Sequence, residues 1–203
     1  MRRLIVNADD LGYTAEVSRG ILEAHERGIV TSASLMVDPP AAEYGVHLVR
    51  AAPQLSVGLH AVLDGIPPAR CDQELTRQLA RFEELVGDRP THLDSHHHAH
   101  REPRIRDVYV AFADRHDLPA REHTIPHDPR FYGAPAIGVE RLLEILGTLA
   151  EGVSELVCHP GYADGLVSRY TVEREQELRS LTDPRVRARA DELDIELIGW
   201  REL

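Results

Sequence analysis

The stretch Leu4-Ile5-Val6-Asn7-Ala8-Asp9-Asp10-Leu11-Gly12 decides the fold of this chain. A short apolar run that passes directly into acidic residues and glycine is typical of a buried β-strand ending at a polar edge. The apolar run is too short for a signal peptide, so we expect a first strand here. Neighbouring side chains of a strand point to opposite faces. Asp9 and Asp10 can therefore share a site only where the strand ends, and Leu11-Gly12 fits such an ending.

The rest of the chain alternates short apolar runs with longer segments of helical period, which predicts a β/α protein with a mainly parallel sheet. The expected strands are Leu4–Ala8, Ser32–Val37, Ser56–Val62, Thr91–Ser95, Ala120–His123, Glu155–His159 and Ile195–Gly199. The expected helices are Ala15–Arg27, Ala41–Ala52, Asp72–Val86, Arg104–His116, Val139–Glu151 and Val172–Leu193, the last broken at Pro184.

Polar residues gather at the C-terminal ends of several expected strands, namely at Asp9-Asp10, His60, Asp94–His98 and His159. In a (β/α) barrel these ends converge on one face, whereas an open sheet joins only the strands beside its switch point. We therefore expect residues 1–203 to form a single-domain α/β fold. Its architecture is a distorted or incomplete TIM barrel with about seven strands.

Composition narrows the class of protein. The formal net charge of −11 disfavours a nucleic-acid partner or an anionic membrane surface, because phosphate binding depends on clustered basic residues. No apolar run reaches the roughly 20 residues that a spanning helix needs. Two cysteines provide no disulfide framework and fit a reducing compartment. We expect a cytoplasmic protein that acts on a small, neutral molecule.

Histidine is the unusual feature of the composition: five of the twelve lie within the nine residues from His92 to His100. If the segment is extended, alternation places His96, His98 and His100 on one side and His97 on the other. Imidazoles and carboxylates are ligands for divalent ions, and a ligating histidine usually donates its second N–H to an acceptor such as Asp94. A solvated histidine-rich loop, with Asp9 or Asp10 as a helix cap, is the alternative.

The expected ligands are Asp10, His60 and His96. Three protein ligands leave positions for water and substrate, which is typical of a catalytic metal site. A divalent ion there polarises a carbonyl group and lowers the pKa of water. Asp9 is then the candidate base, and His159 the candidate acid that protonates a departing amine. Arg121 is a candidate contact to a sugar hydroxyl or carbonyl, or a surface ion-pair partner. Helix residues 174–178 are interpreted as a charged face without a catalytic role.

These motifs resemble one family, the YdjC-like carbohydrate deacetylases, which include the chitooligosaccharide deacetylases. The matching elements occur in family order and are Asn7–Gly12, Gly28–Ser32, Val57–His60, Pro90–His100, Glu155–Gly161 and Arg174–Leu178. The resemblance implies a barrel-like fold, a divalent ion on Asp10, His60 and His96, and Asp9 as the base. It also implies deacetylation of N-acetylglucosamine-containing oligosaccharides such as diacetylchitobiose. Magnesium is implied by the resemblance, whereas imidazole ligands favour zinc.

The sequence departs from the family pattern at two places. Leu11 replaces the usual Phe beside the metal ligands, and only 35 residues separate His60 from His96, where other members carry a longer insertion. The identity of the sugar and its length therefore stay open. A homodimer is possible, but no interface can be identified from the sequence. The alternatives are a phosphoesterase of the PHP type, a non-haem iron oxygenase with the same ligand types, and a non-catalytic metal- or sugar-binding module.

Overall fold

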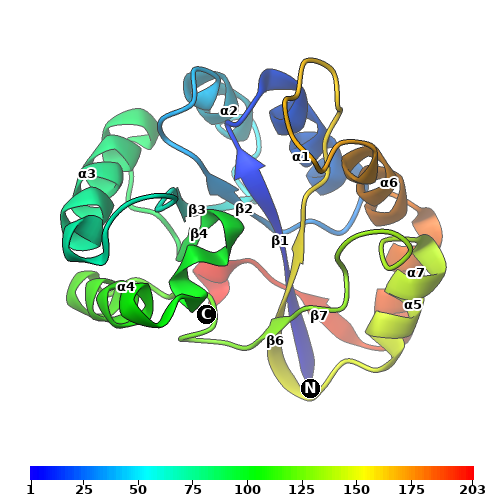
Figure 1. Cartoon of the computed structure of the whole chain (residues 1–203). Coiled ribbons are helices and arrows are strands. Elements are labelled where there is room, and N and C mark those ends of the chain that lie inside the picture. Colours follow the sequence, from blue (N-terminus) through cyan, green and yellow to red (C-terminus); the bar gives the residue numbers. More distant parts are fainter.

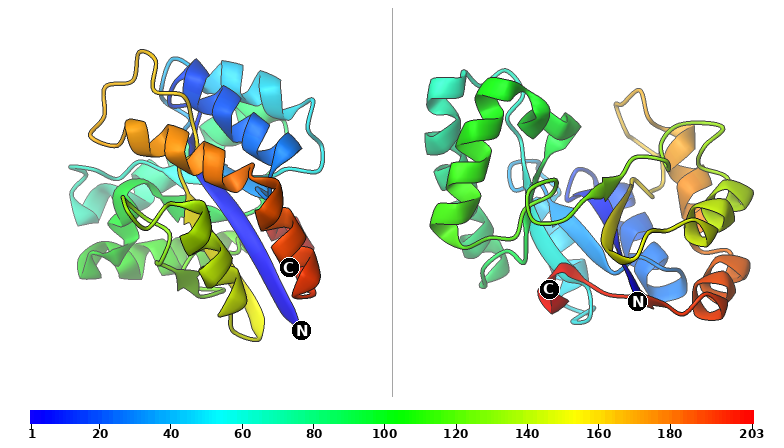
Figure 2. Two further views of the ribbon diagram at one scale, coloured as in Figure 1. Left: turned by 90° about the vertical axis from the view of Figure 1, so that its right-hand side faces the viewer. Right: turned by 90° about the horizontal axis from the view of Figure 1, so that it is seen from below.

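The strands form one parallel sheet that curls into an incomplete barrel, as Figures 1 and 2 show. The computed structural model describes residues 1–203. The strand order is β4-β3-β2-β1-β6-β5, with β7 paired to β1. The strands are β1 Arg2–Leu11, β2 Ser32–Leu35, β3 Ser56–Ala61, β4 Leu93–Ser95, β5 His127–Asp128, β6 Gly152–Cys158 and β7 Ile195–Leu197. The predicted fold class, a distorted barrel of about seven strands, is confirmed.

Strand β1 lies at the centre of the sheet because its apolar residues are covered on both faces. Leu4, Ile5 and Val6 are fully buried. One edge of β1 pairs with β6 from Arg2 to Ala8. The other edge is shared, because β7 pairs with its first residues and β2 with its last ones. This position brings the end of β1 to the middle of the barrel mouth.

Helices surround the outside of the sheet (Figure 1). They are α1 Ala15–Arg27, α2 Ala42–Val49, α3 Pro68–Val86, α4 Pro103–His116, α5 Val139–Gly147, α6 Val172–Leu181 and α7 Pro184–Glu192, with the 3₁₀ segments η1 His96–Arg101 and η2 Trp200–Glu202. Helix α1 illustrates the pattern: Thr14 caps its first turn, and Val17 and Ile21 face the core. The predicted break at Pro184 is confirmed. None of the helices is both long and apolar enough to span a lipid bilayer.

The expected fifth strand at Ala120–His123 is wrong. Only single bridges form there, from Ala120 to Leu93 and from Arg121 to Ile125, and the fifth strand is the short β5. Glu122 has a φ of 58°, and the Thr124 side chain accepts the hydrogen bond from the backbone N–H of Ala120. These local contacts replace a ladder, so this irregular segment, and not a regular strand, leads from α4 to β5.

Candidate active site

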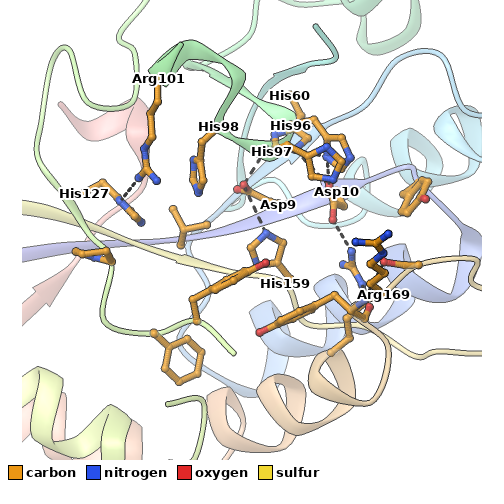
Figure 3. Close-up of a pocket in the computed structure, with 18 of the residues that line it drawn as sticks. Asp9, Asp10, His60, His96, His97, His98, Arg101, His127, His159 and Arg169 are labelled. Carbon is orange, nitrogen blue, oxygen red and sulfur yellow. Dashed lines mark hydrogen bonds and ion pairs between the residues drawn. The ribbon is translucent and has the colours of Figure 1, made fainter. Parts of the chain in front are cut away.

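A cavity of about 710 Å³ opens at the C-terminal ends of the strands (Figure 3). Its volume lies within the range of pockets that bind small molecules. The residues that line it are Asp9, Asp10, Tyr13, His60, His96, His97, His98, Arg101, His127, Pro129, Phe131, Tyr132, Val157, His159, Val167, Ser168, Arg169, Tyr170 and Arg174. Asp9, Asp10, His60, His96 and His159, which the sequence predicts as the reactive centre, are all among them.

The end of β1 turns both aspartates toward this cavity. The register of β1 against β2 shifts between Ala8 and Leu11, and Asp10 has a φ of 72°, which is uncommon for a residue other than glycine. The irregularity overrides the alternation that would otherwise send the two carboxylates to opposite faces. The strand ending expected from Leu11-Gly12 therefore takes the form of a bulge with a left-handed residue.

Asp10, His60 and His96 bring three ligand atoms together from β1, β3 and the start of η1. His60 Nε2 lies 3.2 Å from Asp10 Oδ1 and 3.3 Å from His96 Nδ1, and His96 Nδ1 lies 3.0 Å from Asp10 Oδ1. Metal–ligand bonds of about 2.1 Å place neighbouring ligands of a six-coordinate ion roughly 3 Å apart. The triangle thus has the size and the donor types that one divalent ion requires.

Electrostatics around this triangle favour a positive charge. His60 Nδ1 donates to Asp94 Oδ1 at 2.6 Å, which leaves Nε2 as the free acceptor that faces Asp10 and His96. Burial alone lowers the pKa of His60, but the carboxylates of Asp94 and Asp9 outweigh it and raise the pKa to about 10. The carboxylates that stabilise the proton on His60 would also stabilise a cation beside its Nε2. The residues present therefore fit a divalent ion.

Asp94 is itself held by a buried hydrogen-bond chain. Ser34 Oγ donates to Asp94 Oδ2 at 2.5 Å, and it accepts from Asn7 Nδ2 at 2.7 Å. His92 Nε2 lies 3.0 Å from the same hydroxyl. Because Ser34 has one proton and gives it to the carboxylate, His92 must donate through Nε2. Burial, the largest effect, lowers the pKa of His92 to about 3, so that the ring is neutral.

Asp9 is separate from the ligand triangle and is ionised. Arg121 binds it through two nitrogens, at 2.8 Å to Oδ2 and 2.7 Å to Oδ1. Burial alone raises the pKa of Asp9, but the charge of Arg121, followed by that of His60, holds it well below its usual range. Arg121 also contacts Asp94 and Glu155, and its side chain is fully buried. The structure thus places Arg121 behind Asp9 and outside the cavity lining, in a buried ion pair and not at the expected surface position.

The histidine cluster differs from the expected extended segment. Residues from His96 onward form η1, in which His97 and His98 have φ values of 53° and 51°. The expected alternation is therefore wrong. His98 and His97 line the cavity, whereas His100 is fully buried, where Ser95 Oγ and the Glu122 carboxylate contact its ring. Asp94 lies behind His60, so Asp94 and His100 are supporting residues without a place in the cavity wall.

His159 lies next to Asp9 in the cavity. Its Nε2 lies 3.9 Å from Asp9 Oδ2, and the same oxygen lies 4.0 Å from His60 Nδ1 (Figure 3). Burial lowers the pKa of His159 to about 4, which makes the free imidazole neutral. Cys158 next to it is buried and lies outside the cavity lining, in agreement with its interpretation as a small core residue.

Sequence reasoning missed the contribution of α6. Arg174, interpreted as part of a charged surface, is buried and forms an ion pair with Asp10 at 2.5 Å. Glu177 is fully buried on the same helix and accepts hydrogen bonds from the backbone N–H of His159 and from the Tyr170 hydroxyl. Burial raises the pKa of Glu177 to about 8. The three-residue spacing of Arg174 and Glu177 puts both on one helix face, but this spacing does not distinguish a buried face from a solvated one.

Several known proteins are similar in sequence to this chain over nearly its whole length. A carbohydrate deacetylase of Geobacillus stearothermophilus is 37% identical, with 99% of this chain and 98% of the relative covered. A chitooligosaccharide deacetylase of Serratia marcescens is 32% identical, with 98% of each covered. The first alignment spans 241 positions, more than the 203 residues of this chain, so that relative carries segments that this chain lacks.

Solved structures share the fold. An Enterococcus faecalis protein named provisionally for cellobiose-phosphate cleavage has a TM-score of 0.92 and 28% identity, with 99% of this chain and 98% of that chain covered. A family 4 carbohydrate esterase of Streptomyces lividans has a TM-score of 0.64 at 13% identity, with 96% and 90% covered, and supports the fold alone. The profile of the family described as YdjC-like protein matches residues 3–72 and 64–192. This chain therefore belongs to the YdjC-like family.

Proposed function

We propose that this chain is a metal-dependent carbohydrate deacetylase that hydrolyses the acetamide of an N-acetylated sugar. The observation that carries the proposal is the combination, in one cavity, of the Asp10–His60–His96 triangle with a separate ionised carboxylate, Asp9. The names of the full-length relatives, carbohydrate deacetylase and chitooligosaccharide deacetylase, support the same reaction. The fit of the cavity volume to a small molecule supports a sugar as the substrate.

Asp10, His60 and His96 would hold the divalent ion, which when bound polarises the acetyl carbonyl and makes water a better nucleophile. Asp94 fixes the tautomer of His60, and Arg174 neutralises the second oxygen of Asp10. Three buried carboxylates whose pKa values are lowered, Asp9, Asp10 and Asp94, surround the centre, and two buried guanidinium groups, those of Arg121 and Arg174, oppose them. A cation suits this excess of negative charge.

Asp9 is the base of the proposed reaction. It accepts one proton from the attacking water, while the water oxygen forms a bond to the acetyl carbon. When the C–N bond breaks, the leaving nitrogen needs a proton. His159 Nε2 is 3.9 Å from Asp9 Oδ2, so the imidazole is placed to receive the proton from Asp9 and to pass it to the nitrogen. The products are acetate and the free amino sugar.

The test is acetate release from N-acetylated mono- and disaccharides in the presence of Mg²⁺, Zn²⁺, Co²⁺ or Mn²⁺. Asp9→Asn preserves the shape of the side chain and should lower kcat at least about a hundredfold, because it removes a general base. Metal affinity, measured by calorimetry, should change little, because Asp9 is outside the ligand triangle. Asp107→Asn, on the exposed face of α4, is the matched control. Unchanged acetate release by Asp9→Asn would contradict the proposal.

A further inference from the structure

Tyr132 is an exposed aromatic residue on the wall of the cavity. Its side chain lines the same cavity as Asp9 and His159, yet 62% of the residue is exposed. Its ring centroid is 5.8 Å from that of His159, with the two rings nearly perpendicular at 69°. A large aromatic ring that stays open to solvent beside a reactive centre has no role in the core. Its open surface is therefore free to contact a ligand.

The Tyr132 ring is fixed in place from behind. Tyr170 stacks on one face of it, with ring centroids 5.1 Å apart and an angle of 11° between the planes. The Tyr170 hydroxyl donates to Glu177 Oε1 and accepts from the backbone N–H of Gly133, the residue after Tyr132, at 3.1 Å. We call Tyr132 and Tyr170 together the aromatic wall. The wall is held at both its stacked face and its backbone.

Glu177 connects the wall to the reactive centre. Its other carboxylate oxygen, Oε2, accepts from the backbone N–H of His159. One fully buried side chain on α6 thus sets the positions of the candidate acid and of the ring that supports Tyr132. A ligand group that packs on Tyr132 would therefore be held at a fixed distance from His159.

The geometry points to a sugar-binding subsite: we propose that the aromatic wall binds the pyranose ring next to the residue that is deacetylated. A pyranose ring with equatorial hydroxyls presents C–H groups on its face, and these pack against the negative face of an aromatic ring. Tyr132 has one face covered by Tyr170 and the other available for such packing. The ligand is then a linked N-acetylated disaccharide rather than a monosaccharide. This inference rests on the proposed deacetylase function.

The test compares kcat/KM for diacetylchitobiose with kcat/KM for N-acetylglucosamine in the metal-loaded protein. Tyr132→Ala should lower the disaccharide-to-monosaccharide ratio about tenfold, mainly through KM, because only the second ring contacts the wall. Tyr132→Phe keeps the ring and should recover most of the ratio. Tyr44→Ala, an exposed tyrosine of α2 outside the cavity lining, is the matched control. An equal loss for both sugars, or no loss for either, would overturn the subsite.

Failure of the proposed function would look different. In that case the unaltered protein would release acetate from neither sugar. The sugar subsite is then tested by measuring, with calorimetry, the affinity for chitobiose, the fully deacetylated disaccharide. Weaker binding by Tyr132→Ala than by Tyr44→Ala supports a sugar subsite without catalysis. Equal binding by the unaltered protein and by Tyr132→Ala overturns it.

Discussion

The ligand side of the cavity and the α6 side differ in what holds their residues in place. On the ligand side, Asp10, His60 and His96 come from strand ends and are backed by buried hydrogen bonds through Asp94 and Ser34. On the α6 side, a helix reaches across with charged side chains to hold a neighbouring strand end and two loops. The first arrangement suits the proposed ion, whereas the second connects the reactive centre to the aromatic wall.

Removing one of the proposed metal ligands should have the largest effect on this comparison. His96→Ala deletes one corner of the triangle, so the affinity for divalent ions should fall by more than about a hundredfold, beyond the effect typical of outer residues, and acetate release should be lost with it. Calorimetry of the metal-free protein measures the affinity directly. His47→Ala is the control, because that imidazole is exposed on α2 and lies outside the cavity lining. Similar affinities for the two variants would remove His96 from the ligand set.

Removing the hydrogen bond that supports Asp94 should lower the metal affinity by an intermediate amount. Ser34→Ala removes the only hydroxyl that Asp94 accepts from, which loosens the carboxylate that orients His60. Metal affinity should fall about tenfold, as for other outer contacts of metal sites. Ser32→Ala is a close control: the side chain lies on the same strand face, but its hydroxyl bonds only the backbone oxygen of Ser56. Equal affinities of the two variants would show that Asp94 needs no support from Ser34.

The α6 side should respond to pH in a measurable but smaller way. The pKa of Glu177 is raised to about 8 by burial, so the folded state retains a proton that the unfolded state releases near pH 4.5. Its contribution to the free energy of unfolding is therefore intact below pH 4.5 and decreases until about pH 8. Glu177→Gln removes this titration. Its unfolding temperature relative to the unaltered protein should be higher at pH 8.5 than at pH 5, and a constant difference would contradict the buried protonated carboxyl.

The same contrast explains what could be predicted from the sequence. The ligand side was accessible because Asp10, His60 and His96 lie at ends of apolar runs, and parallel strand ends meet at one face. The helices and six of the strands followed from hydrophobic period. Arg174 and Glu177 were missed, because a charged helix residue is usually solvated and only tertiary packing reveals that these two are buried. The expected strand at Ala120–His123 failed because local turn contacts outcompeted the ladder.

Arg121 has a consequence for the closure of the barrel. It belongs to the irregular segment between β4 and β5, where single bridges take the place of a ladder, and it joins Asp9 of β1, Asp94 of β4 and Glu155 of β6. The ion pairs of Arg121 thus connect β4 with β6 across the gap where backbone pairing is incomplete. A lysine at position 121 would have a single compact ammonium group in place of the planar guanidinium. It would leave at least one of the carboxylates of Asp9, Asp94 and Glu155 without its ion pair. The three ion pairs thus depend on the guanidinium of Arg121, and through Asp9 they link the reactive centre to the gap between β4 and β5.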